Sequence, residues 1–575
     1  MLALRAALNT SSKSSGSSDA PGRRWIPLLL EFGLIAAMVV LPFAWRVWMG
    51  AGELPAGDAW AYERIFDTYH TTGALRLVGW NDITLVGMIP VTSLWVAIVG
   101  YGALQLHLLG SVMCAVALYG LRSLLITFDT PRRWAALVLF GGYGGMVGIA
   151  GTYLSDTFAI AGCIWAVALA ARVAHNRASH TPLFDNVMAG MAALAAAFGF
   201  LVRQQMVVGA LAAAWLLWTA RSRAPRAFAI FVALFVVVAT PVYLWRSGLE
   251  HGGQIEFDLH PRGVLAAAEG LVIAQGAALF SAALWLRGAK PIGRQALAIG
   301  ATVTAAAYAA LCASWSVAEP AHPLVLGIQE QFGLIGGALL LVPLLAAATA
   351  GWAWAFTLWG GTLPHAGSIT TPPFTTPPTT TPPLSAHPLG RLALLGLAVE
   401  FAVILTTGAY FTRYSLFTVS LAYVAILARP LKGGAIAVAV TIALMIGSFW
   451  ELDHSIAPTG AVLAAGRITA CLGIPPEHVD ATFSWDGKYF QGIASVYHGD
   501  LSADDGLPLT QDWSTFPSMD RDAVLTPHDP GLRDSWLVLG PLETSGLLPG
   551  NRQEWWLTVR RSAIAVPDPT VCRGA

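Results

Sequence analysis

Long apolar segments, separated by short polar stretches, dominate this sequence. About 20 apolar residues are enough for one helix to cross the hydrocarbon core of a bilayer. Of the 575 residues, 55% are hydrophobic and only 11% are charged, whereas charged residues make up roughly 25% of a soluble domain. The sequence therefore predicts an α-helical polytopic membrane protein. Its formal net charge of zero argues against a nucleic-acid partner.

Hydropathy predicts about 13 transmembrane helices in a membrane domain that covers residues 26–450. The apolar run 83–124 is too long for one crossing, so its part up to Gly100 is expected to lie at the interface or to re-enter the membrane. Juxtamembrane helices are therefore expected within residues 57–100. Crossings are expected near residues 26–45, 104–124, 133–150, 157–173, 186–202, 206–220, 227–245, 264–286, 296–315, 333–359, 391–409, 415–428 and 434–450.

The Lys and Arg residues in the loops predict the orientation, because cytoplasmic loops carry an excess of both. Before residue 451, one set of alternate loops carries 18 of them and the other carries 7. The N-terminus is therefore expected in the cytoplasm, as a disordered tail over residues 1–25, and the first apolar segment is interpreted as an uncleaved anchor in the inner (plasma) membrane. With an odd number of crossings, residues 57–70 and 451–575 lie outside the cytoplasm.

Two further regions are distinguished by composition. A Pro/Thr linker at 360–390 contains SITTPPFTTPPTTTPP and is expected to be a cytoplasmic spacer, or an external stalk if the count of crossings is off by one. Residues 451–575 are rich in turns and predict a small external domain, α+β or β-rich. Cys471 and Cys572 could pair there. Trp485, Trp555 and Trp556 either pack this domain, rest on the membrane interface or stack on sugars.

The stretch GDAWAYERIFDTYH places five ionisable groups directly after the first apolar segment: Asp58, Glu63, Arg64, Asp67 and His70. It predicts either an amphipathic surface helix or an active site. Three more motifs lie at predicted outer ends of crossings: TYLSDTF with Asp156, FLVRQQM with Arg203, and YFTRY with Arg413 and Tyr414. A charged side chain at the membrane edge costs free energy unless water solvates it or an opposite charge pairs with it, or else it is kept because a function requires it.

Each of these residues has a structural interpretation beside the functional one. The two aspartates could be helix N-caps, and the two arginines could be anchors that snorkel to the interface. As a group, they suit transfer from a lipid-linked anionic donor. A carboxylate can accept the proton of an acceptor hydroxyl, and guanidinium groups match the oxygens of a phosphate leaving group.

In the order of these motifs the chain resembles the bacterial GT-C glycosyltransferases, which include lipopolysaccharide sugar transferases and protein O-mannosyltransferases. The resemblance covers roughly residues 26–430 and departs from the family pattern at IPVTS, where only Pro90 stands in place of a His-Pro or Pro-Pro pair. It implies a polyprenyl-phosphate-linked sugar donor and a glycan, lipid or protein acceptor. A catalytic role is implied for Asp58, as general base, and for Asp156.

Five residues are expected to bind substrate: Tyr62, Glu63, Arg203, Arg413 and Tyr414. On helical spacing Asp58 and Tyr62 share the face that meets substrate, while Glu63, Asp67 and His70 lie on a solvated or acceptor-facing side. No cofactor or metal ligand is assigned, and metal dependence stays open. A lipid-linked sugar flippase or other transporter is the alternative function. A transporter would be expected to show internal repeats, or broken helices in matching halves of the chain. A non-catalytic scaffold is a third interpretation.

Overall fold

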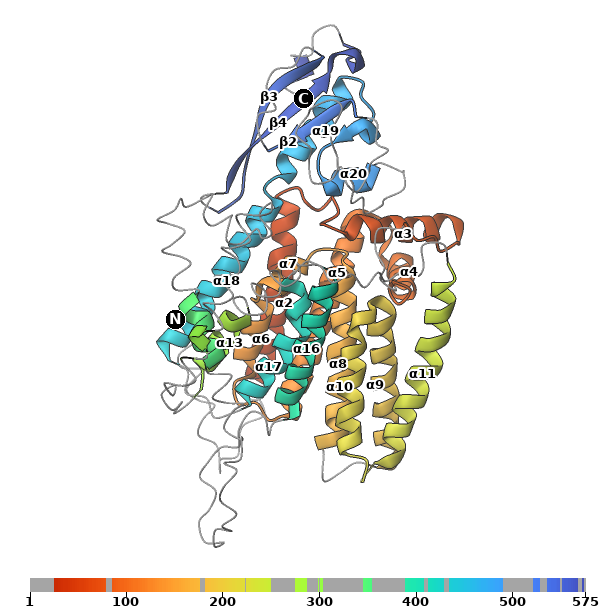
Figure 1. The fold of residues 1–575 in the computed structure, drawn as a ribbon, viewed down its shortest axis with the longest axis vertical. Coiled ribbons are helices and arrows are strands. Elements are labelled where there is room, and N and C mark those ends of the chain that lie inside the picture. Colours follow the sequence, from red (N-terminus) through yellow and green to blue (C-terminus); the bar gives the residue numbers. More distant parts are fainter. Residues whose placement is uncertain are drawn as a thin grey trace.

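The computed structural model describes most of the chain: residues 25–78, 85–175, 181–222, 224–249, 275–286, 298, 300–302, 345–353, 388–407, 412–428, 434–489, 521–527, 535–548, 551–566 and 571–572. These residues form a bundle of apolar helices with a small α+β domain at one end (Figure 1). The predicted class is therefore confirmed. Most of the Pro/Thr linker and of the N-terminal tail lie outside the described residues, as do residues 264–274 and most of 296–315 and 333–359.

The first half of the chain supplies most of the described bundle. Its elements are α2 (Trp25–Trp48), α3 (Ala59–Thr72), α4 (Met88–Val99), α5 (Ala103–Thr127), α6 (Arg133–Gly141), α7 (Gly144–Ile149), α8 (Ser155–His175), α9 (Pro182–Val202), η3 (Gln204–Met206), α10 (Val207–Thr219) and α11 (Pro225–Ser247). Helix α9 shows how the local sequence starts a helix: Pro182 occupies its first turn and the Thr181 side chain accepts a hydrogen bond from the Phe184 amide.

The second half completes the bundle and forms the C-terminal domain. Its elements are α13 (Gln275–Ala283), α16 (Pro388–Thr407), η6 (Thr412–Ser415), α17 (Leu416–Leu427), α18 (Ala435–Ile456), α19 (Thr459–Cys471), η7 (Pro476–His478), β1 (Val479–Asp480), α20 (Phe483–Tyr489), β2 (Ala523–Thr526), β3 (Trp536–Ser545), β4 (Arg552–Arg560) and η9 (Arg561–Ala563).

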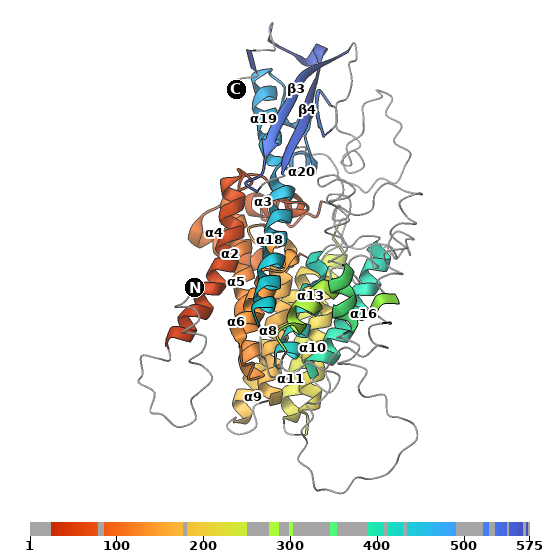
Figure 2. The same cartoon turned by 90° about the vertical axis from the view of Figure 1, so that its left-hand side faces the viewer.

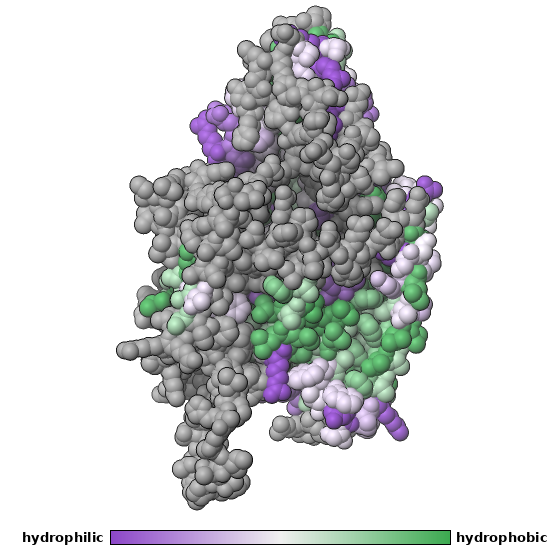
Figure 3. Space-filling model, viewed as in Figure 1, coloured by the Kyte–Doolittle hydropathy of each residue, from purple (hydrophilic) through white to green (hydrophobic). Residues whose placement is uncertain are grey.

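Six of the described helical segments are long and apolar enough to cross a membrane. They are Leu28–Trp48, Ala103–Thr127, Ser155–His175, Pro182–Val202, Pro225–Ser247 and Ala435–Cys471, the last of which takes in both α18 and α19. Hydrophobic residues cover the surface of the bundle over the region of α9 to α11, and hydrophilic residues gather at its lower tip (Figure 3). The chain is a membrane protein, and six of its predicted crossings correspond to these segments.

The structure corrects the predicted crossing at 133–150. Two short helices, α6 and α7, occupy this region and are separated at Gly142 and Tyr143. The amide of Gly142 still bonds back to Val138, but Tyr143 has an extended backbone with ψ of 135°, which ends the helical path. By contrast, the long run 83–124 divides as expected, with α4 ending before Gly100 and α5 beginning at Ala103.

Small residues allow the helices that carry the charged motifs to pack closely. A Cβ atom added at Gly162 of α8 would lie 2.8 Å from the Ala195 carbonyl and the Gly199 amide of α9. One added at Gly199 would lie 3.2 Å from the Ala159 carbonyl of α8. Close approach of helix backbones at glycine is common in membrane bundles. The α8–α9 contact therefore sets the spacing between the ends of these two helices.

Helix α3 lies across the end of the bundle that faces the C-terminal domain (Figures 1 and 2). It ends at Gly73, whose φ of 71° is in the left-handed region that favours glycine. The core of this end includes Trp60, Tyr62 and Phe66, which are 0–2% exposed. These aromatic side chains fix α3 on the bundle, so its first residue is held at a defined place.

The C-terminal domain is a four-stranded sheet in the order β1-β2-β4-β3, with α19 packed against it. The pair β1–β2 is parallel, and β4 is antiparallel to both β2 and β3. A register shift between Val538 and Pro541 bends the β3–β4 hairpin and accommodates the proline. Cys471 and Cys572, which the sequence showed only as a possible pair, form a disulfide.

Three contacts fix this domain to the membrane bundle. Helix α18 extends past the predicted boundary at residue 451 and ends at Ile456. The buried Asp453 carboxylate accepts hydrogen bonds from the Trp45 indole of α2, from the amides of Leu547 and Leu548, and from the Asn551 side chain. Helix α20 packs against α3, and Leu54 from the α2–α3 loop belongs to the core of the domain.

Candidate active site

Four charged residues singled out by the sequence meet at the end of the bundle that faces the C-terminal domain. Asp58 precedes α3, Asp156 lies in the first turn of α8, Arg203 directly follows α9, and Arg413 lies in η6. Arg413 is 355 residues from Asp58 in sequence. The fold therefore brings together motifs that the sequence could only place at the same depth.

The contacts within this group are ion pairs. Arg413 Nη2 lies 3.2 Å from Asp58 Oδ2, and Arg413 Nε lies 3.4 Å from Asp156 Oδ2. Arg203 Nη1 lies 2.5 Å from the same Asp156 oxygen. Asp156 is thus shared by two guanidinium groups, and Arg413 spans two carboxylates. These four residues are called the Asp–Arg cluster below.

The cluster is closed on one side and open on the other. The side chains of Asp156 and Arg203 are 2% and 6% exposed, whereas those of Arg413 and Asp58 are 16% and 23% exposed. Buried opposite charges need each other, because an unpaired charge away from water is very costly. Asp156 and Arg203 therefore form the inner part of the cluster, and a ligand approaching from outside meets Asp58 and Arg413 first.

Two of these residues do not act as the structural interpretation would require. Asp58 occupies the N-cap position of α3, but its side chain makes no capping hydrogen bond and points its carboxylate to Arg413. Arg203 is buried at the C-terminal end of α9, where the helix dipole favours a cation. Asp156 lies at the N-terminal end of α8, where the dipole favours an anion. An interfacial anchor is exposed, so snorkelling does not describe Arg203.

Tyr62 lies one helical turn beyond Asp58 and is 2% exposed. Burial, followed by the negative charge of Asp58, raises the pKa of the Tyr62 phenol above its ordinary value. The phenol is therefore neutral, and it is buried near the charged residues of the cluster.

Glu63 does not lie on a solvated face, which was one of the two alternatives expected for it. Its side chain is 15% exposed, and its Oε1 lies 3.0 Å from Nε2 of the buried His107 in α5. Further along α3 the prediction fits better, because Asp67 accepts a hydrogen bond of 2.9 Å from the exposed Tyr101 hydroxyl. The sequence analysis missed His107, although a histidine near the start of an apolar helix was a signal.

The remaining predicted residue is Tyr414, whose backbone lies in η6 beside Arg413. Its side chain is outside the described part of the structure. Within the described residues, no three His, Cys, Asp or Glu side chains come together as a metal site would require. The two carboxylates of the cluster flank the Arg413 guanidinium, which supplies a positive charge between them.

No family model matches the sequence, and no curated protein matches it. Among solved structures, the chain is similar to ArnT from Cupriavidus metallidurans bound to undecaprenyl phosphate, with 14% identity and a TM-score of 0.38 over 95% of this chain and 100% of that chain. The apo state of the same protein gives 16% identity and a TM-score of 0.39, covering 96% and 100%.

A third solved structure is the archaeal oligosaccharyltransferase AglB from Archaeoglobus fulgidus, in complex with an inhibitory peptide and a dolichol-phosphate. The similarity covers 75% of this chain and 55% of that chain, with 13% identity and a TM-score of 0.34.

Proposed function

We propose that this protein transfers a sugar from a polyprenyl-phosphate donor to a hydroxyl group of an acceptor at the outer face of the membrane. The observation that supports this most is the convergence of Arg203 and Arg413 on one oxygen of Asp156, with Asp58 on the open side. Two guanidinium groups at the end of a membrane bundle suit a phosphate whose lipid tail stays in the bilayer.

The proposed reaction uses the cluster as follows. Arg203 and Arg413 hold the phosphate of the donor. The acceptor hydroxyl oxygen forms a bond to the anomeric carbon, and the bond from that carbon to the phosphate oxygen breaks. The phosphate leaves with the electron pair, and its charge is stabilised by the guanidinium groups. Asp58 accepts the proton of the hydroxyl.

Exposure supports the assignment of the base. Asp58 is 23% exposed and contacts Arg413, whereas Asp156 is 2% exposed and is held by both arginines. An acceptor reaching the cluster from outside therefore meets Asp58 before Asp156. We propose Asp58 as the base and Asp156 as the residue that orients the two guanidinium groups. Arg413 lies between the carboxylates, and no cofactor is assigned to the proposed transfer.

Glu63, Tyr62 and Tyr414 have a supporting part in the proposal. Glu63, which contacts His107 of α5, lies along α3 between Asp58 and the exposed end of that helix. This is the side from which a glycan, lipid or protein acceptor would come. Tyr62 positions Asp58 from within the core, and Tyr414 is kept as a substrate-binding residue because it follows Arg413 in η6.

The first test replaces the proposed base. Asp58→Asn removes the negative charge with little change in volume, so we expect it to lower turnover by about 10²–10⁴-fold, the range for a general base. Purified protein in lipid, given a polyprenyl-phosphate sugar, would be assayed for sugar transfer and for donor binding. Binding should stay close to that of the wild type.

Asp67→Asn is the matched control, because Asp67 belongs to the same helix but contacts Tyr101 instead of the cluster. It should retain most turnover. Normal transfer by Asp58→Asn together with an inactive Asp156→Asn would move the base to α8. If the wild type moves the lipid-linked sugar across a vesicle membrane and transfers nothing, the protein is a flippase and not a transferase.

A further inference from the structure

A set of buried polar side chains lies behind η6, the short helix that carries Arg413. Gln275 begins α13, Glu400 lies in the second half of α16, and Ser415 ends η6. The Gln275 amide nitrogen Nε2 donates hydrogen bonds to Glu400 Oε2 at 2.9 Å and to Ser415 Oγ at 2.8 Å. The three residues, called the Gln–Glu–Ser network below, are 2%, 6% and 0% exposed.

Stability alone does not explain the network. Moving a carboxyl group and an amide from water into an apolar bundle is costly even when they are hydrogen-bonded. Apolar side chains of similar size would pack the same space without that cost. An ionisable residue inside a membrane bundle is therefore expected to serve a function, and its partners indicate which one.

Ser415 shows what the network holds. Serine is a preferred N-cap residue, and it normally accepts a hydrogen bond from a backbone amide in the first turn of the helix. Ser415 precedes α17, yet its side chain makes no capping bond. Its hydroxyl accepts the hydrogen bond of Gln275 instead, and the same Gln275 nitrogen also bonds to Glu400. The end of η6 is therefore tied to α13 and α16.

Arg413 lies two residues before Ser415 in the same short helix. Its guanidinium spans Asp58 and Asp156 at 3.2 and 3.4 Å, so a shift of η6 by about 1 Å would break at least one of these contacts. We propose that the Gln–Glu–Ser network holds η6 in place and thereby positions Arg413 for the donor phosphate. Gln275, Glu400 and Ser415 act through the backbone of η6, so they are positioning residues.

The network is tested by replacing Glu400 in two ways. Glu400→Ala removes the acceptor, whereas Glu400→Gln keeps the shape and one carbonyl oxygen for Gln275. Ser415→Ala removes only the hydroxyl that ties η6, which gives a second variant if Glu400→Ala folds poorly. Thr441→Val is the matched control, because it removes the buried bond from Trp285, just beyond the far end of α13, to Thr441 of α18.

The first readout needs no ligand. Hydrogen exchange of the backbone amides in residues 412–418, followed by mass spectrometry, reports how firmly η6 is held. We expect Glu400→Ala and Ser415→Ala to speed exchange in this segment, and Glu400→Gln and Thr441→Val to leave it close to the wild type. If Glu400→Ala changes nothing there, or if Thr441→Val has the same effect, the positioning role is wrong.

The second readout rests on the proposed function, because it takes Arg413 to be a phosphate ligand. Affinity for polyprenyl phosphate would be measured in lipid nanodiscs. We expect Glu400→Ala to weaken it by roughly tenfold, as partial loss of a hydrogen bond to a charged group would, and Glu400→Gln to restore it. In an Arg413→Ala background Glu400→Ala should have no further effect, since the two changes act on one contact.

The experiments distinguish a failure of the proposed function from a failure of the positioning role. If Arg413→Ala does not weaken polyprenyl-phosphate binding, the proposed function is wrong at this site, while the exchange result still decides whether the network holds η6. If Arg413→Ala weakens binding and the Glu400 and Ser415 variants alter neither exchange nor affinity, the network is not a positioning device. An additive effect of Glu400→Ala in the Arg413→Ala background would also overturn the proposal, because the network would then act on another contact.

Discussion

At the scale of single residues, Arg413 links the more exposed carboxylate of the Asp–Arg cluster to the buried one. Its Nη2 and Nε atoms contact two carboxylates that come from α3 and α8. The planar fork of a guanidinium group allows both contacts to be made at once, whereas a lysine ammonium is a compact point charge on a flexible stem. The shape of the arginine side chain therefore matters here as well as its charge.

Arg413→Lys tests this difference. The variant keeps the positive charge but loses one of the two contacts, so we expect donor binding to weaken by about 1.5–3 kcal/mol, the range for a hydrogen bond to a charged group. Titration with polyprenyl phosphate in nanodiscs measures it. Arg64→Lys is a suitable control, since Arg64 is in α3 but is not a member of the cluster. Full binding by Arg413→Lys would mean that charge alone is enough.

The sequence predicted the four members of the cluster because each stands out as a charge beside an apolar run. It did not predict their pairing, because pairs such as Arg413 and Asp58 are 355 residues apart and no local pattern records such a distance. The burial of Glu63 was not predicted for a similar reason: helical spacing defines the face of α3, but the buried partner of Glu63, His107, comes from α5. Glu400 was overlooked, although a lone carboxyl group in an apolar run was a visible signal.

At the scale of elements, the position of the cluster depends on how closely α8 and α9 approach each other. Asp156 begins α8 and Arg203 follows α9, and the two helices are in contact through Gly162 and Gly199. A side chain at this contact would push the helices apart. Because the ion pair between Asp156 and Arg203 is buried, a displacement would leave two charges poorly compensated.

Gly162→Ala is expected to destabilise the protein by about 1–3 kcal/mol through overpacking and to lower transfer activity. Thermal unfolding in detergent and the transfer assay measure the two effects. Gly190→Ala is the matched control in α9, because its Cβ would have no neighbour closer than 3.8 Å. Equal behaviour of the two variants would show that the α8–α9 approach does not set the geometry of the cluster.

At the scale of the whole molecule, the C-terminal domain is attached to the bundle at both sides of α3. On one side Asp453 connects α18 to α2 and to the turn of the β3–β4 hairpin. On the other side the Lys488 ammonium donates a hydrogen bond of 2.6 Å to the Glu53 carbonyl. The domain therefore stands over the end of the bundle that contains the cluster, in a fixed orientation.

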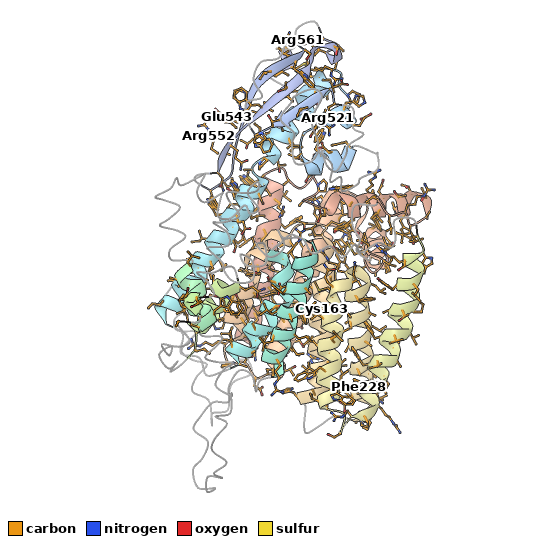
Figure 4. All side chains as sticks on the ribbon, viewed as in Figure 1. Cys163, Phe228, Arg521, Glu543, Arg552 and Arg561 are labelled. Carbon is orange, nitrogen blue, oxygen red and sulfur yellow. A yellow bond between two sulfur atoms is a disulfide. The ribbon has the colours of Figure 1, made fainter. Side chains whose placement is uncertain are left out.

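Asp453→Ala removes an acceptor shared by four donors, so we expect the hairpin to come loose from α2. Limited proteolysis and hydrogen exchange of residues 545–552 measure this. Glu543→Gln is the control, because Glu543 and Arg552 form an exposed ion pair on the same hairpin (Figure 4). Such a pair contributes about 0–1 kcal/mol, and its loss should leave the hairpin protected. Protection retained in Asp453→Ala would show that α20 and Leu54 hold the domain by themselves.

The sidedness of the molecule remains a prediction, made from the distribution of Lys and Arg. Since 18 of these residues lie in one set of loops and 7 in the other, the C-terminal domain and the cluster should face away from the cytoplasm. A reporter that is active only in the cytoplasm, fused after Ala575, should be silent, and the same reporter fused after Arg223 should be active. The reverse result would place the cluster on the cytoplasmic side.

The junction at Asp453 also bears on how the protein is made. Trp45 leaves the ribosome long before Asp453, and Leu547, Leu548 and Asn551 follow later still. During synthesis the carboxylate therefore lies near the C-terminal end of α18 with only one of its four partners already made. A nascent chain that stops before the β3–β4 hairpin would present the Asp453 carboxylate without three of its four hydrogen-bond donors. Cellular quality control can recognise such a chain as an unfinished protein.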